Sequence, residues 1–332
     1  MKHIAALSRE EREELFLNTA HKVGMPPAIV EKDFWVCYML DYLFHRCAWK
    51  ERLVFKGGTS LSKAYHLIER FSEDIDLILD WRLLGYGIEE PWEPRSNTQQ
   101  DKFSESSEKK TILLLEESFI PMLQIGISAE IGEAANVFLE KAGEPTVNFA
   151  YPQIFTDVSI LQVIRLEIGA LASWSPTQDA VITPFAAEQY PQIFTHPDTV
   201  IRTAVPERTF WEKITILHRE ANRIRGDFPG RYSRHYYDLY QMSGSAVKTH
   251  AFQDLDLLKD VVAFKKKFYR CPWAKYEEAV PGSVKLIPSE QYFPELQKDY
   301  SKMKNMIYGE VPSFDELLSS VRLLEAEINS LK

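Results

Sequence analysis

The stretch LVFKGGTSLSKAYHLIERFSEDIDLILD, residues 53–80, decides the fold of this chain. Leu53–Phe55 is a short apolar run that ends at two glycines, a pattern typical of a strand followed by a tight turn. Apolar residues then recur every three or four positions and predict a helix capped by Thr59 or Ser60. The apolar face of that helix contains Leu61, Ala64, Leu67, Ile68 and Phe71. A second strand, Asp74–Leu79, is expected to follow it.

Two carboxylates lie on this second strand. Side chains alternate across a strand, so Asp74 and Asp76 point to one face, and the opposite face carries Ile75, Leu77 and Leu79. Carboxylates one strand repeat apart can share divalent cations, and backbone N–H groups of a glycine turn can approach a phosphate. The pattern therefore predicts a site for a metal-bound triphosphate. A solvated strand edge beside a turn of no function is the alternative interpretation.

The combination of glycines at a helix start and Asp-x-Asp on the next strand resembles the polymerase-beta-type nucleotidyltransferase superfamily. The fuller wording, FKGGTSLSKAY followed by RFSEDIDL, resembles more specifically the AbiEii/AbiGii toxin family of nucleotidyltransferases. Other segments that resemble this family are VEKDFWV, FWEKITILH, SRHYYDLYQM and MIYGEVPSFDELL. The resemblance is thus spread over nearly the whole chain.

The resemblance implies transfer of a nucleoside monophosphate from a nucleoside triphosphate to a hydroxyl group, with release of pyrophosphate. Asp74 and Asp76 would bind Mg²⁺, and Glu167 would be the third carboxylate of the metal cluster or would accept the proton of the attacking hydroxyl. Lys213 would neutralise the charge of the leaving pyrophosphate, and Asp238 would orient Lys213 or a neighbouring arginine.

The phosphate-binding residues implied by the resemblance are Gly57, Gly58, Thr59 and Ser60, with Lys56 offsetting the phosphate charge. Lys56 could equally serve only as a neighbour of a carboxylate.

Glu167 is the candidate because of the pattern of Leu161–Gly169, a predicted strand. Alternation along this strand places Arg165 and Glu167 on the same face. An ion pair between these two side chains on an exposed face is the alternative interpretation, and the superfamily more usually has aspartate at this position.

Length and composition are those of an ordinary soluble globular protein, with 332 residues, 45% hydrophobic and 26% charged. No apolar run long enough to cross a bilayer and no signal peptide are evident, and three cysteines without metal-ligand spacing fit a reducing cytoplasm. The net charge of −9 argues against nucleic-acid binding by the whole surface.

The predicted fold class is α/β (α+β) with two lobes. A nucleotidyltransferase lobe, 1–200, would hold N-terminal helices, a small mixed sheet and a polar insertion near 85–110, and 201–332 would form a helical lobe. The insertion is expected to be a loop, followed by a helix from Glu105 to Leu123 and strands at ISAEI and VNFAY. A later helix, 206–226, is predicted to bury Phe210, Ile214, Leu217, Ala221 and Ile224.

A local positive charge distinguishes the second predicted lobe. Between Arg202 and His235 there are eight arginines and lysines against four acids, a net of +4. Further on, FKKKFYRCPWAKY interleaves basic and aromatic residues, as single-stranded RNA binding requires. The alternative is a solvated helix face followed by a packed loop.

The family resemblance implies an RNA acceptor, with the tRNA 3′ end as the expected target, and toxicity through blocked translation. It also implies a type IV toxin–antitoxin and phage-defence role, in which the cognate antitoxin need not bind the toxin stably. Two alternatives stay open: a small molecule or protein hydroxyl as the acceptor, and a catalytically silent relative that binds nucleotide.

One further cluster of charges stands within the predicted N-terminal helices. Glu31, Lys32 and Asp33 are consecutive in VEKDFWV. A structural role is favoured over a functional one, because charges that line a helix beside an active site more often pair within the protein.

Overall fold

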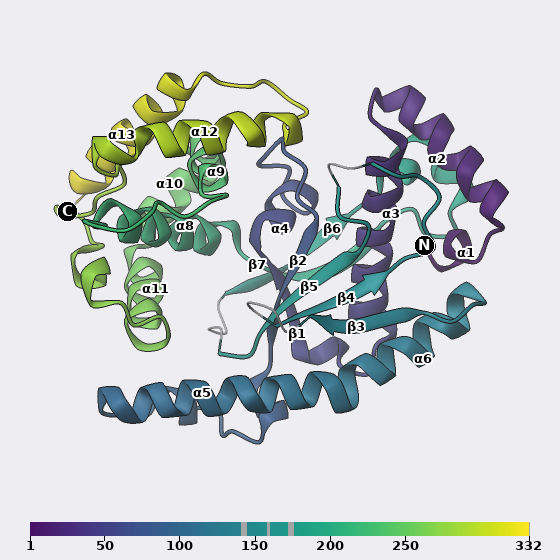
Figure 1. Ribbon diagram of the computed structural model, residues 1–332, viewed down its shortest axis with the longest axis horizontal. Helices are drawn as coiled ribbons and strands as arrows, with labels where there is room; N and C mark the ends of the chain where they lie inside the picture. The colour runs from purple at the N-terminus through teal and green to yellow at the C-terminus, as the bar shows by residue number, and fades with distance from the viewer. Residues whose placement is uncertain (141–144, 158–159, 172–175, 332) are drawn as a thin grey trace. The chain divides into compact units, whose positions relative to one another are not determined.

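A computed structural model describes residues 1–140, 145–157, 160–171 and 176–331 (Figure 1). The chain divides into two compact units. The first unit comprises Met1–Ala64 and Glu73–Thr203, and the second comprises Tyr65–Ser72 and Ala204–Lys332. The segment Tyr65–Ser72 therefore leaves the first unit and returns to it eight residues later in the chain.

The first unit is built on one mixed sheet in the order β3-β4-β5-β2-β1-β7-β6. β2 lies inside this sheet, antiparallel to β1 and parallel to β5. The strands are β1 (Leu53–Lys56), β2 (Asp74–Leu79), β3 (Asn136–Glu140), β4 (Thr146–Ala150), β5 (Ile164–Gly169), β6 (Thr177–Ile182) and β7 (Thr199–Ala204). The mixed α/β class and the two predicted strands around the glycine turn are confirmed.

The helices of the first unit are α1 (Lys2–Ala5), α2 (Arg9–Val23), α3 (Pro27–Asp41), α4 (Gly57–Lys63), α5 (Asn97–Leu114), α6 (Ile120–Ile131) and α7 (Phe185–Gln189). The predicted N-terminal helices are confirmed, and residues that favour helix ends define both ends of α2. Ser8 and Glu11 form a capping box at the start of α2, and Gly24 ends that helix at a φ of 68°.

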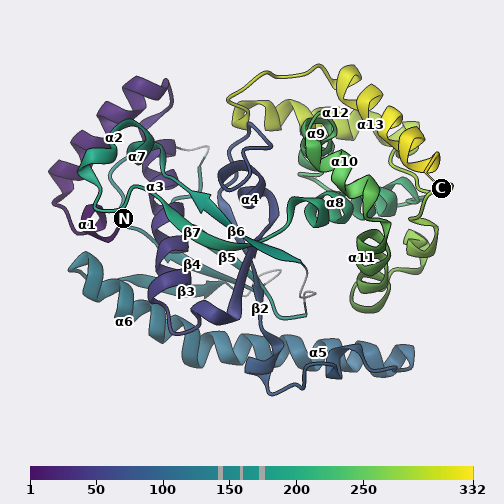
Figure 2. The same cartoon turned by 180° about the vertical axis from the view of Figure 1, so that it is seen from behind.

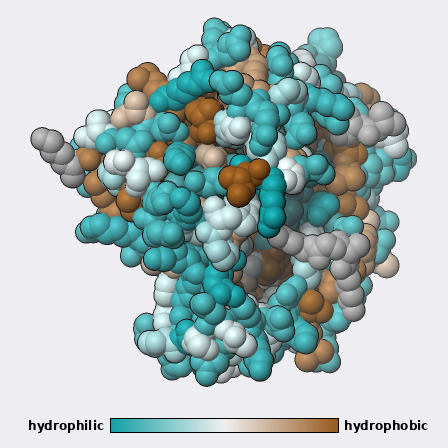
Figure 3. Space-filling model, turned by 60° about the vertical axis from the view of Figure 1, so that its left-hand side comes forward, coloured by the Kyte–Doolittle hydropathy of each residue, from teal (hydrophilic) through white to brown (hydrophobic). Residues whose placement is uncertain are grey.

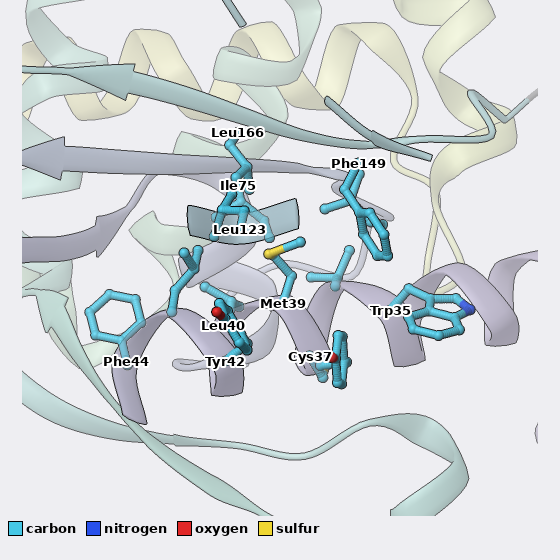
Figure 4. Close-up of a cluster of buried hydrophobic side chains, with 14 of the residues drawn as sticks. Trp35, Cys37, Met39, Leu40, Tyr42, Phe44, Ile75, Leu123, Phe149 and Leu166 are labelled. Atoms are coloured by element: carbon cyan, nitrogen blue, oxygen red, sulfur yellow. The ribbon is translucent and has the colours of Figure 1, made fainter. Parts of the chain in front are cut away.

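The core of the first unit lies between α3 and the sheet (Figure 4). Every residue of α3 from Val30 to Leu40 is buried. Trp35 of α3 packs edge-on against Phe149 of β4, with 5.9 Å between ring centroids, and Ile75 and Leu166 belong to the same cluster. Burial on all sides of a helix is unusual for a surface element and makes α3 the central support of β2 and β5.

The helix after the glycine turn is shorter than the sequence predicts. α4 ends at Lys63, so the prediction of a helix to Phe71 is wrong, and Lys56, whose side chain makes no capping bond, stands at the N-cap in place of Thr59 or Ser60. His66 takes a positive φ of 51°, which a helix cannot accommodate. The Phe71 N–H then donates to the Met306 carbonyl oxygen at 2.7 Å within the second unit.

The loop prediction for the polar insertion is wrong from Asn97 onward, where α5 begins, and the predicted helix 105–123 lies within the continuous helix Asn97–Ile131. Ser96 caps α5 through a capping box with Gln99, and a π-helical turn, Leu115–Phe119, joins α5 to α6. The predicted strand at ISAEI is the end of α6. Side chains buried at intervals of four residues, Leu115, Phe119, Leu123 and Ile127, hold this helix against the core.

This continuous helix, Asn97–Ile131, is long and apolar enough to cross a membrane by length and composition alone, where the sequence predicted no such segment. One such helix is weak evidence for a membrane protein, because core helices of soluble proteins pass the same test. Glu116 and Glu117 are exposed near its middle.

The second unit is helical (Figure 2). Its helices are α8 (Pro206–Ala221), α9 (Ser233–Ser243), α10 (Ala246–Gln253), α11 (Leu255–Phe268), α12 (Phe293–Met303) and α13 (Phe314–Asn329). α8 packs against α9, α10 and α11, and α9 packs against α12 and α13. α8 ends at Ala221, so the prediction that Ile224 is buried is wrong; Ile224 is 80% exposed. The Asn222 amide donates to the His218 carbonyl oxygen at 2.9 Å and ends the helix.

The surface is mostly hydrophilic on the face that Figure 3 shows, with hydrophobic residues in small separate groups. Scattered groups of this kind are normal for globular proteins and carry no functional argument.

Candidate active site

The predicted site residues fall into two groups, one in each unit, and each group is described by itself. In the first unit, β2 presents Asp74 and Asp76 on its partly exposed face, and Ile75 and Leu77 on its buried face. The register places Asp76 opposite Lys56 of β1 and opposite Glu167 of β5. The alternation of β2 thus brings both aspartates to one side of the sheet.

Gly57 is required by the close approach of Asp76. Its φ is 82°, and a Cβ atom built on Gly57 would lie 1.9 Å from Asp76 Oδ2. The glycine turn therefore makes room for the carboxylate of Asp76 against the backbone, in addition to any role in phosphate binding.

We expect Gly57→Ala to destabilise the first unit more than Gly24→Ala does. Both glycines have a positive φ, so both substitutions cost about 1–2 kcal/mol of backbone strain. Only Gly57 has a side chain within contact distance of the new methyl group; at Gly24 there is nothing within 4 Å. Urea unfolding of the two variants measures the difference, and equal losses of unfolding free energy would contradict this account.

The hydroxyl groups of the predicted phosphate-binding turn are engaged with the backbone. Thr59 Oγ1 donates to the Asp74 carbonyl oxygen, and Ser60 Oγ donates to the Gly57 carbonyl oxygen at 2.8 Å. Both residues are fully buried. These bonds fasten the start of α4 to the start of β2.

Arg165 lies between two of the predicted metal ligands. Arg165 Nε is 3.6 Å from Asp74 Oδ1, and Arg165 Nη2 is 3.9 Å from Glu167 Oε1. The alternative interpretation of an Arg165–Glu167 pair therefore has a counterpart in the structure, although 3.9 Å is too long for a hydrogen bond. The role of Glu167 as a third carboxylate stays a prediction.

The donor set on β2 fits a hard divalent cation. Within the described residues, no group of three His, Cys, Asp or Glu side chains is positioned to hold a metal ion. Mg²⁺ does not require such a cage, since it is usually held by one or two carboxylates together with substrate phosphates and water. Asp74 and Asp76 are two carboxylates of this kind on one partly exposed face.

In the second unit, Asp238 of α9 holds two cations. Arg70 donates to both carboxylate oxygens of Asp238 at 2.7 and 2.8 Å, and Lys213 Nζ lies 2.8 Å from Oδ2. All three side chains are at most 7% exposed. The sequence prediction that Asp238 orients Lys213 or an arginine agrees with both contacts, but it did not identify the arginine as Arg70.

Burial and charge set the ionisation of this cluster. Burial alone would raise the pKa of Asp238, but Arg70 and Lys213 hold that pKa well below its usual range. Burial lowers the pKa of Lys213, and the charge of Arg70 acts in the same direction, whereas Asp238 opposes them. Two cations on one carboxylate leave an excess of positive charge, which favours an anionic ligand.

Two neighbours on α9 add to this cluster and were missed by the sequence reasoning. Burial, Lys213 and Arg234 hold the pKa of His235 well below its usual range, so the imidazole is neutral at pH 7. Among the described residues, Arg234 Nε and His235 Nδ1 are buried atoms without a hydrogen-bond partner. The signal was present in SRHYYDLYQM, where both residues precede Asp238, but a single sequence cannot show which of them face Lys213.

Much of the predicted basic field is paired internally. Arg223 Nε lies 2.5 Å from Glu220 Oε2, and Arg208 Nε lies 3.0 Å from Glu212 Oε1. Arg223 also lies over the Trp273 ring, at 4.8 Å from its centroid. The aromatic segment still has Lys266, Tyr269 and Arg270 exposed.

The charged triplet of α3 is completely buried. Glu31, Lys32 and Asp33 are 0%, 0% and 3% exposed. Glu31 Oε1 and Oε2 accept from the backbone N–H groups of Ile154 and Phe155 at 2.8 and 2.9 Å. The structural role that the sequence favoured is confirmed for Glu31, which ties the loop after β4 to α3.

We expect Glu31 to make stability fall as the pH rises. Burial raises the pKa of Glu31 to about 7, against the backbone donors that lower it. Because this folded-state pKa lies above the ordinary carboxyl value, the stabilisation is fully present below about pH 4.5 and is lost as the pH rises through 7. The contribution is on the order of 3 kcal/mol. Urea unfolding at pH 5 and pH 8 should show a smaller change for Glu31→Gln than for the wild type; an identical pH dependence would contradict the assignment.

Comparison with known proteins identifies the family. A family model described as "Nucleotidyl transferase AbiEii toxin, Type IV TA system" matches residues 41–320. Among solved structures, the chain is similar to MenT4, a nucleotidyltransferase toxin from Mycobacterium tuberculosis H37Rv, with 15% identity, a TM-score of 0.42, and coverage of 96% of this chain and 99% of that one. A search of curated proteins finds no match. Because the family model spans most of the chain, the protein belongs to the AbiEii family of nucleotidyltransferase toxins of type IV toxin–antitoxin systems.

Proposed function

We propose that this nucleotidyltransferase transfers a nucleoside monophosphate from a nucleoside triphosphate to the 3′ end of tRNA in a Mg²⁺-dependent reaction, and so inhibits translation. The observation that carries the proposal is the pair Asp74 and Asp76 on one partly exposed face of β2, with Gly57 making room for the Asp76 carboxylate.

The two aspartates would hold Mg²⁺, and Glu167, in register with Asp76, would be a third carboxylate near them. The metal, when bound, would neutralise phosphate charge and orient the α-phosphate for attack by the acceptor hydroxyl. The acceptor hydroxyl oxygen would form a bond to the α-phosphorus, and the bond from that phosphorus to the oxygen bridging to the β-phosphate would break, which releases pyrophosphate. The hydroxyl proton would pass to Glu167 or to water. Lys56, Gly57 and Gly58 would contact the phosphates.

Lys213 would contribute by neutralising the charge that develops on pyrophosphate. This role is supported by the excess of positive charge around Asp238, where Arg70 and Lys213 share one carboxylate. Asp238 would orient both cations without leaving its own charge unpaired.

An RNA acceptor is supported by the exposed basic and aromatic side chains Lys266, Tyr269 and Arg270, a combination suited to phosphates and unstacked bases. A tRNA acceptor would place the reaction in the cytoplasm. A cognate antitoxin would neutralise the toxin in the cell, without a stable complex being required.

Incubating the purified protein with Mg²⁺ and each α-³²P-labelled nucleoside triphosphate in turn, with total RNA, a protein extract or a small-molecule extract, tests the proposal. Label in tRNA-sized RNA is the expected result, and the labelled nucleotide identifies the base. Label only in protein or in small molecules would show that the acceptor is not RNA. Nucleotide binding without transfer would indicate a catalytically silent relative.

A further inference from the structure

Lys32 and Asp33 of α3 are buried charges to which the proposed reaction assigns no role. Buried lysine and aspartate side chains are costly unless they are paired, so each requires a partner. The partners of these two residues are Glu73, directly before β2, and Lys63, the last residue of α4.

Lys32 is paired with the residue that precedes Asp74. Lys32 Nζ forms a short ion pair with Glu73 Oε2 and donates to the Leu161 carbonyl oxygen at 2.5 Å. The Lys32 side chain is 0% exposed, and that of Glu73 is 10% exposed. This pair fixes the start of β2, and hence the position of Asp74, against α3.

Asp33 is paired with the last residue of α4. Asp33 Oδ1 lies 2.7 Å from Lys63 Nζ, and Asp33 Oδ2 accepts from the Phe185 N–H at 2.7 Å. The Lys63 side chain is 10% exposed and lies over the Phe185 ring, with Nζ 4.1 Å from its centroid. The end of α4 is therefore also fixed against α3.

These contacts link α3, α4 and β2 to one another in pairs. α3 holds the end of α4 through Asp33 and the start of β2 through Lys32. The start of α4 is in turn bonded to the start of β2, where Thr59 donates to the Asp74 carbonyl oxygen. The segment that joins α4 to β2, Tyr65–Ser72, belongs to the second unit. Within the first unit, these side-chain contacts hold the end of α4 and the start of β2 to α3.

We propose that Lys32, Asp33 and Glu73 are positioning residues that set the metal-binding geometry of Asp74 and Asp76. The inference rests on the proposed metal-dependent function. Side chains that orient metal ligands from behind typically change metal affinity or activity by about 10–100-fold when they are replaced.

The test is the affinity for Mn²⁺ alone, measured by electron paramagnetic resonance on the full chain. The first variant is Glu73→Gln, which keeps the shape of the side chain and removes its charge. The second is the double variant Lys32→Met/Glu73→Gln, which leaves no buried charge unpaired and therefore keeps the fold if the single variant does not.

Asp80→Asn is the matched control, because Asp80 follows the other end of β2. Its carboxylate is 0% exposed and is paired with Arg52, whose Nη1 lies 2.7 Å from Oδ2, and with Arg82, whose Nη2 lies 2.5 Å from the same oxygen. Asp80 lies six residues beyond Asp74, roughly 20 Å along an extended strand. A loss of Mn²⁺ affinity that comes only from weakening β2 would therefore appear in this variant as well.

We expect Mn²⁺ to bind about 10–100-fold more weakly to the Glu73 variants and unchanged to Asp80→Asn. Wild-type affinity in both Glu73 variants, or an equal loss in Asp80→Asn, would overturn the positioning role. Asp76→Asn separates the two hypotheses: if it abolishes binding while the Glu73 variants bind normally, the metal site stands and only the positioning role fails. If it binds Mn²⁺ normally, the metal site and the positioning role fail together.

Discussion

Asp76→Asn is expected to reduce nucleotide transfer by on the order of 100-fold or more, with little change in stability. Asparagine keeps the size of the side chain and removes the negative charge that a divalent cation requires. Asp76 is only partly buried, so the loss of its charge is not expected to disturb the core. The measurement is the initial rate of label transfer from the preferred α-³²P-labelled triphosphate, together with the melting temperature of each protein.

Asp179→Asn is the control for this experiment. Asp179 is also an aspartate on a strand of the first unit, in β6, and it is exposed. Its variant should transfer label at the wild-type rate. Transfer by Asp76→Asn at a rate within a few-fold of the wild type would show that the Asp-x-Asp strand is not the metal-binding element.

The strands that carry the site could be predicted because their signals are local. β2 alternates aspartate with isoleucine and leucine, and a period of two places both aspartates on one face whatever surrounds the strand. The same holds for Arg165 and Glu167 on β5, whose partly buried positions alternate with the buried Ile164 and Leu166. Which strand would lie beside β2 could not be read from either pattern.

The predictions of helix length are wrong where tertiary contacts determine the structure. The apolar positions Leu67, Ile68 and Phe71 continue the helical pattern of α4, yet they belong to the second unit and follow a residue with positive φ. In the polar insertion the opposite occurred, because residues from Asn97 onward, whose composition is typical of a loop, begin a helix that continues through the predicted helix 105–123 to Ile131. A regular row of buried side chains holds the second half of this helix. Local propensity is a weak prior in both cases.

The buried ion pairs could not be predicted because their partners are far apart in the chain. Arg70 and Asp238 are separated by 168 positions, and Lys32 and Glu73 by 41. A single sequence shows that each of these residues is charged. It does not show which of them are buried, or which residue pairs with each buried charge. These pairings fix the geometry of both groups of candidate residues.

The second large effect is expected at Asp238, where a loss of stability and a loss of activity can be separated. Asp238→Asn removes the carboxylate that pairs with Arg70 and Lys213 and leaves two buried cations without a counter-charge. Breaking a buried pair in this way costs about 3–5 kcal/mol. A decrease of the melting temperature on the order of 10 °C is the expected result, measured by circular dichroism.

Lys213→Met is the matched variant, because it removes one cation and leaves Asp238 paired with Arg70 through two hydrogen bonds. A methionine can occupy the buried volume of the lysine stem, so the melting temperature should fall much less than in Asp238→Asn. Label transfer should nevertheless drop on the order of 100-fold, since the charge that we propose to offset pyrophosphate is lost. Equal destabilisation by both substitutions, or full activity of Lys213→Met, would mean that the cluster serves only to hold Arg70 and α9 together.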